Sequence, residues 1–224
     1  MLKKIKQSKS EKILLIFLIS LAITTFSSFI LIKNKCLFVQ KVDVNKLAIE
    51  NKENFVVMNV NCGNVVIQLL PEVSPKAVAR FKNIVVNKEY DDIAFHRVVE
   101  NFLVQAGDLE FGKKGNINYT YIGSGKSKYG LIRPENDKPF DFKKGSVGFA
   151  KSKNGDMEDS EFFILLSDAP LFEGEYTPLG YVTHGLKALT KIKSGNKSEY
   201  VLRPDFINSL RMLSEISNWP KVCQ

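Results

Sequence analysis

Hydrophobic residues follow two patterns along this chain, and each predicts a different part of the molecule. Residues 13–32 form one uncharged and mainly apolar run, and residues 33–53 are mixed, without a clear period. From residue 54 onward the apolar residues fall in short β-branched or aromatic runs separated by glycine, asparagine or proline. Runs of this kind predict short strands joined by turns. We therefore expect one folded domain over residues 54–216, followed by a tail over residues 217–224.

Most of the short runs are expected to be strands. FVVMNV and NVVIQLL are joined by Asn-Cys-Gly, a sequence typical of a hairpin turn. Further strands are expected in IAFHRVV, FLVQAGD, GSVGFA, EFFILL, YTPLGYVTHG and, unless it is helical, FINSLRML. The glycine-rich stretch 112–130 is expected to be a loop. Because closing a sheet removes its exposed edges, so many short strands favour a closed or nearly closed barrel.

Two helices are expected to cap this barrel. Ser74 and Pro75 have the residue types of a helix N-cap and a first helical turn. The core face that follows at helical spacing comprises Ala77, Val78, Phe81, Ile84 and Val85. A second, shorter helix is expected in LKALTKI, residues 186–192.

The distribution of charge changes the interpretation of the N-terminus. The formal net charge is +8, but residues 1–35 hold seven lysines against Glu11, which leaves only +2 for the other 189 residues. A nucleic-acid partner is therefore not indicated. Residues 13–32 are twenty uncharged residues, which is about the length that crosses a hydrocarbon core as a helix. The run is thus expected to be a transmembrane helix, preceded by a basic cytoplasmic segment over residues 1–12.

An uncleaved signal-anchor fits this run better than a signal peptide, which has a shorter apolar region and a small-residue cleavage site. Five lysines precede the run and fewer follow it closely, so the domain is expected on the extracytoplasmic, periplasmic side of the cytoplasmic membrane. Residues 33–53 would then be a tether. Lys-Asn-Lys before Cys36 argues against a lipidation site, which needs small apolar residues there.

The cysteines and histidines indicate no metal site. Cys36, Cys62 and Cys223 lack the spacing of metal ligands. Two alternatives stay open: a disulfide between Cys62 and Cys223, or free thiols. The disulfide is conceivable because an exported domain meets an oxidising compartment. His96 and His184 are the only histidines, and neither has a nucleophile motif beside it; His184, before a short helix, is expected to have a surface or capping role.

The stretch FHRVVENFLVQAGD, residues 95–108, places a histidine and an arginine side by side between apolar residues. Strand alternation puts Arg97 on the face opposite His96, either at the surface or facing a ligand. This stretch resembles the FHR…F-x-x-Q-G-G-D signature of the cyclophilins, the peptidyl-prolyl cis-trans isomerases. GSVGFAKSKNGDMEDSEFFILL and LFEGEYTPLGYVTHGLKAL resemble two further segments of that family, in the right order, within residues 54–215.

The resemblance implies a mainly β fold, an eight-stranded antiparallel β-barrel capped by two α-helices, with a groove for an extended, proline-containing peptide. It implies that Arg97 is the catalytic residue and that His96 is scaffold. Phe163 corresponds to the base of the proline pocket and Phe172 to its apolar wall. The residues assigned to substrate binding are Phe102, Leu103, Gln105, Ala150, Lys151, Glu161, Phe163, Leu171, Phe172 and Tyr176.

The implied chemistry needs no nucleophile, metal or cofactor. Rotation about a peptide bond is slow because nitrogen lone-pair density is delocalised, with a barrier of roughly 18 to 20 kcal/mol. A fixed guanidinium can hydrogen-bond that lone pair as it localises, while an apolar slot holds the proline ring and excludes water. Lowering the barrier by about 5 kcal/mol would already give a useful enzyme, since about 1.36 kcal/mol is worth a factor of ten.

Three positions depart from the commonest family sequence. Glu161 stands where the family has glutamine, and its carboxylate is expected either to hold the guanidinium of Arg97 or to compete with substrate for it. Glu161→Gln is expected to keep or raise turnover. Lys151 replaces asparagine and is expected to favour acidic peptides. Leu171 replaces tryptophan or phenylalanine, so weak cyclosporin inhibition is expected.

Two functions from different classes stay open at this stage. The first is a monomeric, membrane-tethered bacterial isomerase that acts on X-Pro bonds of exported or unfolded proteins. The second keeps the fold as a binding or chaperone module that captures proline-containing segments without accelerating isomerisation. The family set of groove residues favours the enzyme, and the substitutions at Glu161 and Lys151 leave room for the module.

Overall fold

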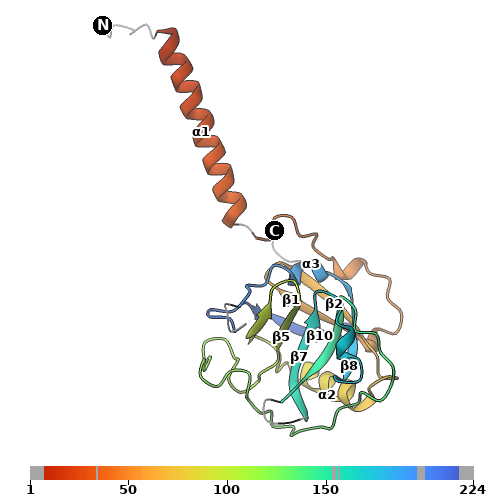
Figure 1. Ribbon diagram of the computed structural model, residues 1–224. Coiled ribbons are helices and arrows are strands. Elements are labelled where there is room, and N and C mark those ends of the chain that lie inside the picture. Colours follow the sequence, from red (N-terminus) through yellow and green to blue (C-terminus); the bar gives the residue numbers. More distant parts are fainter. Residues whose placement is uncertain (1–7, 34, 153–154, 156, 196–199, 217–224) are drawn as a thin grey trace. The chain divides into compact units, whose positions relative to one another are not determined.

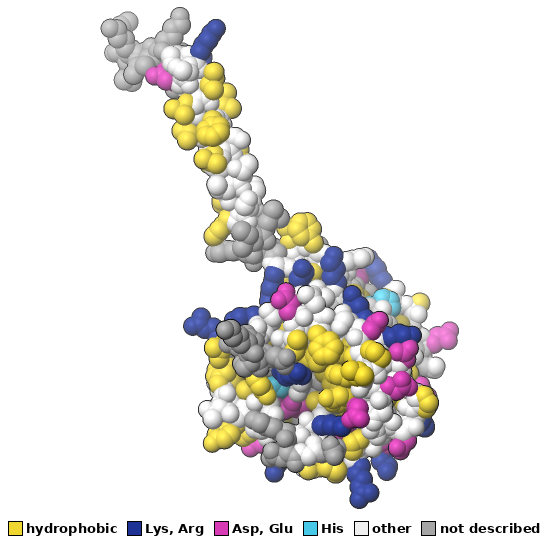
Figure 2. Space-filling view, in the orientation of Figure 1, with side chains coloured by type: hydrophobic (Ala, Val, Ile, Leu, Met, Phe, Trp, Pro, Cys, Tyr) yellow, Lys and Arg dark blue, Asp and Glu magenta, His cyan; other side chains and the backbone are white. Residues whose placement is uncertain are grey.

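The computed structural model describes residues 8–33, 35–152, 155, 157–195 and 200–216, in a chain that divides into two compact units, Met1–Phe38 and Val39–Gln224. The described part of the first unit is mainly one helix, α1 (Lys9–Lys33). By length and composition α1 is able to cross a membrane, and its side chains over residues 9–30 are solvent-exposed (Figure 2). The helix predicted over residues 13–32 is confirmed, and it begins four residues earlier.

The second unit is built on a curled sheet of eight antiparallel strands in the order β10-β1-β2-β8-β6-β7-β5-β4 (Figure 1). These strands are β1 (Phe55–Val60), β2 (Gly63–Leu69), β4 (Arg97–Val99), β5 (Leu103–Ala106), β6 (Ser146–Lys151), β7 (Glu158–Leu165), β8 (Pro178–His184) and β10 (Ser209–Met212). A two-stranded sheet pairs β3 (Ile93–Ala94) with β9 (Phe206–Ile207). The eight-stranded antiparallel architecture expected from the sequence is confirmed, in the form of a half-barrel.

Two runs predicted as single strands are each divided in the structure. In IAFHRVV, β3 ends at Ala94 and β4 begins at Arg97, because the two halves pair with different strands, β3 with β9 and β4 with β5. The run FINSLRML is a strand rather than a helix, but Asn208 separates β9 from β10 and donates its N–H to the carbonyl of Asn59. Both interruptions occur where the chain passes from the small sheet to the large one.

Helix α2 (Pro75–Val86) packs on the sheet through the core face predicted from the sequence, and all five residues of that face are buried. Phe81 is central to this contact. Its ring centroid lies 5.3 Å from that of Phe162, 6.2 Å from that of Phe149 and 5.2 Å from that of Tyr90. Burial of each such side chain contributes about 2 to 3 kcal/mol, so this cluster is a major part of the core.

The cap of α2 differs from the prediction. Ser74 makes no side-chain hydrogen bond to the helix, and its hydroxyl donates instead to the carbonyl of Glu135. The carboxylate of Glu135 accepts hydrogen bonds from the N–H groups of Lys76 (2.8 Å) and Ala77 (2.9 Å). A carboxylate from a loop remote in sequence therefore caps this helix, which the local sequence could not reveal. The second predicted helix is present as α3 (Leu186–Leu189).

Residues 42–49, in the stretch predicted as a tether, pack on β1 and β2. Val44, in the short turn η1 (Val44–Lys46), is buried with Val57, Val66 and Leu213. This cover explains why β1 and β2 are buried at almost every position rather than at alternate positions. The remaining short helical turns are η2 (Lys52–Asn54), η3 (Pro170–Phe172) and η4 (Leu213–Glu215).

Candidate active site

A row of four residues crosses the sheet and defines the candidate site. Arg97 on β4 lies opposite Gln105 on β5, Gln105 lies opposite Phe163 on β7, and Phe163 lies opposite Gly148 on β6. Residues directly opposite each other on neighbouring strands present their side chains on the same face. The strand register therefore places a guanidinium, an amide, an aromatic ring and a position without a side chain next to one another.

Gly148 makes room for the ring of Phe163. A Cβ atom at position 148 would lie 2.6 Å from Cζ of Phe163 and 3.1 Å from the carbonyl oxygen of Thr177. The ring therefore lies directly against the backbone of β6. It is also edge-on to the rings of Phe172 (5.4 Å, 87°) and Tyr176 (5.2 Å, 81°). Phe163 is 2% exposed and forms the floor of an aromatic slot.

The walls of this slot are apolar. The rings of Phe172 and Tyr176 lie 4.5 Å apart, and Phe102 packs behind Phe172 at 5.8 Å. Leu103 and Ala150 are buried in the same cluster. A slot of this composition favours a small apolar ring over a polar group, because a polar group would lose its water without gaining a partner.

A chain of polar contacts leads from Arg97 into the sheet. Nη1 of Arg97 donates to Oε1 of Gln105 (3.3 Å), and Nε2 of Gln105 donates to Oε2 of Glu161 (2.8 Å). Nε2 of His96, which is 1% exposed, lies 3.3 Å from the same oxygen, although without hydrogen-bond geometry. An ionised carboxylate only accepts hydrogen bonds. Glu161 therefore keeps the NH₂ group of Gln105 towards itself and the amide oxygen towards Arg97.

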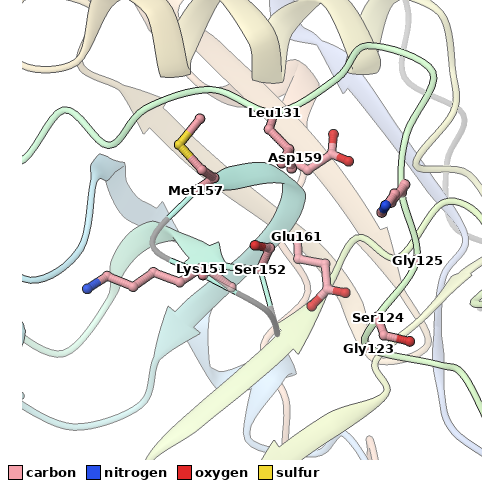
Figure 3. A pocket seen from close by; sticks show the side chains of 12 residues that line it. Gly123, Ser124, Gly125, Leu131, Lys151, Ser152, Met157, Asp159 and Glu161 are labelled. Atoms are coloured by element: carbon pink, nitrogen blue, oxygen red, sulfur yellow. The ribbon is translucent and has the colours of Figure 1, made fainter.

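These side chains line one elongated groove. A hollow of about 300 Å³ is lined by Arg97, Leu103, Gln105, Gly123, Ala150, Lys151, Glu161, Phe163, Phe172, Tyr176 and Tyr200. A second hollow of about 160 Å³ shares Gly123, Ala150, Lys151 and Glu161 with it and extends the groove past Asp159 (Figure 3). The side chain of Lys151 extends away from Glu161 (Figure 3), and its Nζ lies 3.3 Å from Oε2 of Glu175.

Asp108 holds the loop that brings Gly123 to this groove. Its buried carboxylate accepts hydrogen bonds from four backbone N–H groups, those of Glu110, Phe111, Gly123 and Gly125. A Cβ atom at Gly125 would lie 2.1 Å from Oδ1 of Asp108, so this close approach requires glycine. The loop predicted over residues 112–130 is thus ordered around one carboxylate.

A second glutamate of β7 lies beside the groove without lining it. Glu158 pairs across the strands with Lys151 and is fully buried. Burial raises the pKa of its carboxyl to about 7; the carboxylate of Glu135 adds to the rise, and contact with Thr177 opposes it. Neither oxygen of Glu158 makes a hydrogen bond of standard geometry, although Thr177 is near enough to affect the pKa.

Nine of the eleven site residues predicted from the sequence line the groove. The other two are not among the lining residues: Phe102 packs edge-on against Phe172, and Leu171 is 87% exposed. In the hollow of about 300 Å³, two lining residues, Gly123 and Tyr200, were missed. Tyr200 comes from the segment after α3 and reaches the groove because it bridges to Arg97, a tertiary contact that no local motif announces.

The remaining chemical candidates are few. In the part of the chain that the structure describes, no cluster of three or more His, Cys, Asp or Glu side chains could hold a metal ion. Cys36 and Cys62 are both disulfide-bonded, so Cys62 is not a free thiol, and Cys223 lies outside the described residues. His184 is exposed, as expected, with its Nδ1 3.1 Å from the hydroxyl of Thr183.

A guanidinium beside an aromatic slot, in an elongated groove on a sheet, is an arrangement that can hold an extended peptide with one ring in the slot. Residues 55–212 match the family described as cyclophilin type peptidyl-prolyl cis-trans isomerase/CLD. A probable peptidyl-prolyl cis-trans isomerase of Brucella suis is 39% identical over 159 residues, which are 69% of this chain and 80% of that protein. One of Helicobacter pylori is 29% identical over 153 residues, 67% of this chain and 87% of that protein.

Solved structures share the fold. A cyclophilin type isomerase of Cryptosporidium parvum, crystallised in the presence of the dipeptide Ala-Pro, gives a TM-score of 0.60 at 24% identity and covers 70% of this chain and 98% of its own. A cyclophilin of Hirschia baltica gives 0.58 at 20% identity, with 75% and 76% covered. This chain belongs to the cyclophilin family. It is a peptidyl-prolyl cis-trans isomerase, as the sequence predicted.

Proposed function

We propose that Arg97 is the catalytic residue of this isomerase and that the groove around it holds the X-Pro bond. The observation that carries the proposal is the row across β4, β5 and β7, which sets the guanidinium of Arg97 beside the slot floored by Phe163. With the proline ring seated in the slot, the prolyl nitrogen lies at the edge of the slot that Arg97 borders. The guanidinium then donates to the nitrogen lone pair as the amide twists.

Gln105 and Glu161 act as positioning residues in this proposal. The oxygen of Gln105 holds one N–H of Arg97, and Glu161 prevents the amide of Gln105 from rotating. Of the two effects expected for Glu161 from the sequence, support of the guanidinium is the one these contacts favour, although the support passes through Gln105. A guanidinium held in place needs no reorganisation when charge localises on the prolyl nitrogen.

A coupled isomerisation assay on a proline tetrapeptide tests the role of Arg97. Arg97→Ala is expected to lower kcat/KM by about 100-fold, which is typical for removal of one preorganised donor. Arg97→Lys keeps the charge but not the rigid fork, so it should recover only a small part of this loss. Equal rates for wild type and Arg97→Ala, near the uncatalysed value, would support the binding module instead.

The groove also bears on substrate choice. Lys151 lines both hollows, and an acidic residue near the proline is expected to improve KM for this reason. Glu175 lies 3.3 Å from its Nζ, so the preference should be small and should grow in Glu175→Gln. Leu171 supplies no ring to the groove, which is consistent with weak binding of cyclosporin.

We further propose that α1 is an uncleaved signal-anchor, that residues 1–12 stay in the cytoplasm, and that the isomerase acts as a monomer on exported or unfolded proteins at the periplasmic side. The exposed apolar surface of α1 and the lysines before it support this topology. Protease added to spheroplasts should degrade the domain of the full chain in wild-type cells. Protection of the domain until the membrane is lysed would place it in the cytoplasm.

A further inference from the structure

A second groove lies at the other end of β8 from the peptide groove. It has a volume of about 530 Å³ and is lined by Gln40, Lys41, Val42, Asp43, Lys46, Leu47, His184, Gly185, Leu186 and Lys187. Tyr176, just before β8, lines the peptide groove, and His184 ends the strand. Seven residues of strand rise about 20 Å, so the two grooves are separate sites.

The rim of this second groove is cationic. Lys41, Lys46 and Lys187 are all exposed, against one carboxylate, that of Asp43. Asp43 lies 3.6 Å from Nζ of Lys46, but both side chains are largely exposed (47% and 83%), so this ion pair leaves the lysine accessible to another anion. Figure 2 shows Lys and Arg side chains gathered over the end of the folded unit that carries α3.

The floor of the groove is apolar. Val42, Leu47 and Leu186 line the same groove as the lysines and are half-buried. A ligand that suits both the lysines and the apolar residues of this groove carries a negative charge next to a hydrocarbon part. Nucleic acid lacks the second feature, and a free phosphate ion lacks it too. The combination fits the headgroup and glycerol region of an anionic phospholipid.

The chain itself determines which lipids are within reach. Residues 34–38 are all that separate the end of α1 at Lys33 from Val39, where the folded unit begins. Lys41 lies eight residues after Lys33, and eight residues span at most roughly 29 Å when fully extended, so Lys41 stays within that reach of the end of α1. Leu37 and Phe38 in this link are 47% and 73% exposed, as suits residues at a lipid interface.

We propose that this groove binds the phosphate headgroups of anionic lipids in the membrane that holds α1. The inference rests on the proposal that α1 spans a membrane. Binding at the His184 end of β8 holds the domain against the lipid surface. The peptide groove, at the Pro178 end of β8, then faces away from the membrane, where unfolded chains can enter it.

The test uses the full chain in lipid nanodiscs, either of phosphatidylcholine alone or with phosphatidylglycerol added. Amide hydrogen exchange is measured over residues 40–47 and 184–187. Phosphatidylglycerol is expected to slow exchange there by about fivefold or more, because each lysine near an anionic surface adds to the attraction. The triple variant Lys41→Gln, Lys46→Gln, Lys187→Gln should lose this protection and keep its isomerase activity.

A charge-matched control separates this groove from general surface charge. The triple variant Lys52→Gln, Lys76→Gln, Lys114→Gln removes three exposed lysines that do not line the groove and should retain the protection. Equal loss in both variants, or protection by inorganic phosphate in phosphatidylcholine discs, overturns the proposal. If the chain inserts into both discs but gains no protection, the groove proposal alone fails. If the chain inserts into neither, the anchor proposal fails as well.

Discussion

Two glutamates of β7, three residues apart, show how differently one strand uses the same side chain. Glu158 is fully buried, and this burial, with a smaller contribution from the carboxylate of Glu135, raises its folded-state pKa to about 7. Glu161 reaches the groove, where Oε2 accepts a hydrogen bond from Gln105 and lies beside His96. A buried charge is costly unless partners replace its water. We therefore expect position 158 to govern stability and position 161 to govern catalysis.

The largest effect is expected from Glu158→Gln. The carboxyl titrates at 4.5 in its reference state and at about 7 in the folded protein, so between these values the folded state binds more protons and the free energy of unfolding falls as pH rises. Above this window the ionised group costs about 3 kcal/mol. The amide removes that cost, so the free energy of unfolding at about pH 8 should rise by up to about 3 kcal/mol, and at about pH 4 it should change little.

Urea unfolding at several pH values measures this difference. Glu173→Gln removes the same charge from an exposed position and serves as the control. It should leave the free energy of unfolding nearly unchanged at every pH. A gain in Glu158→Gln that does not depend on pH would mean that packing, rather than ionisation, explains it. Activity should be the same in both variants, because neither side chain lines the groove.

The next largest effect is expected at the floor of the slot. Gly148→Ala puts a methyl group 2.6 Å from Cζ of Phe163, and Thr177 behind it prevents the backbone from yielding. The ring must then move into the slot. Overpacking of this kind strains the folded protein by about 1 to 3 kcal/mol. The displaced ring takes space that the proline ring needs, so KM for a proline peptide should rise by about tenfold, which corresponds to about 1.4 kcal/mol of binding free energy. The assay would compare KM and kcat of the variant with those of wild type.

A double variant makes this prediction specific. Phe163→Leu removes the ring atoms that the new methyl group would strike, at the expense of the slot floor itself. If the collision is the cause, the double variant should lose clearly less binding free energy for the peptide than the sum of the losses in the two single variants. Additive losses would show that Gly148 acts through the backbone alone.

A smaller effect is expected at Glu161. Glu161→Met keeps the volume but removes the acceptor for Gln105, so the amide is free to turn its NH₂ group towards Arg97. We expect a fall in kcat of about tenfold with KM nearly unchanged, because the lost interaction acts in the transition state. Glu161→Gln retains an acceptor oxygen and should keep or raise turnover. A large drop in Glu161→Gln would instead show that the negative charge is required.

The sequence patterns predicted the parts of this structure that depend on contacts between neighbours along the chain. The hairpin of β1 and β2, the core face of α2 and the strands that carry Arg97 and Phe163 all follow from local periodicity or motif. The missed features depend on distant contacts. Glu135 caps α2 across 58 residues of sequence, and β3 and β4 separate because they join different sheets. No local pattern encodes either contact.

The smallest predicted effect tests the groove residue that the sequence did not indicate. Tyr200 is 39% exposed, its ring stacks on that of His96 (6.4 Å, 25°), and its edge lies against Gly123. The ring therefore closes the groove beside Arg97. Tyr200→Ala should raise KM by about threefold without changing kcat, since it removes contact area that ground and transition states share.

Tyr200→Phe separates the ring from its hydroxyl and should behave as wild type, because the expected contribution is apolar. Tyr121→Ala is the matched control: this tyrosine is 56% exposed, packs on Phe111 and does not line the groove. If Tyr200→Ala lowers kcat instead of raising KM, its stacking on His96 matters more than its contact with substrate. Tyr200 would then act with Glu161, through His96, on the orientation of Gln105, and the groove would end at Arg97.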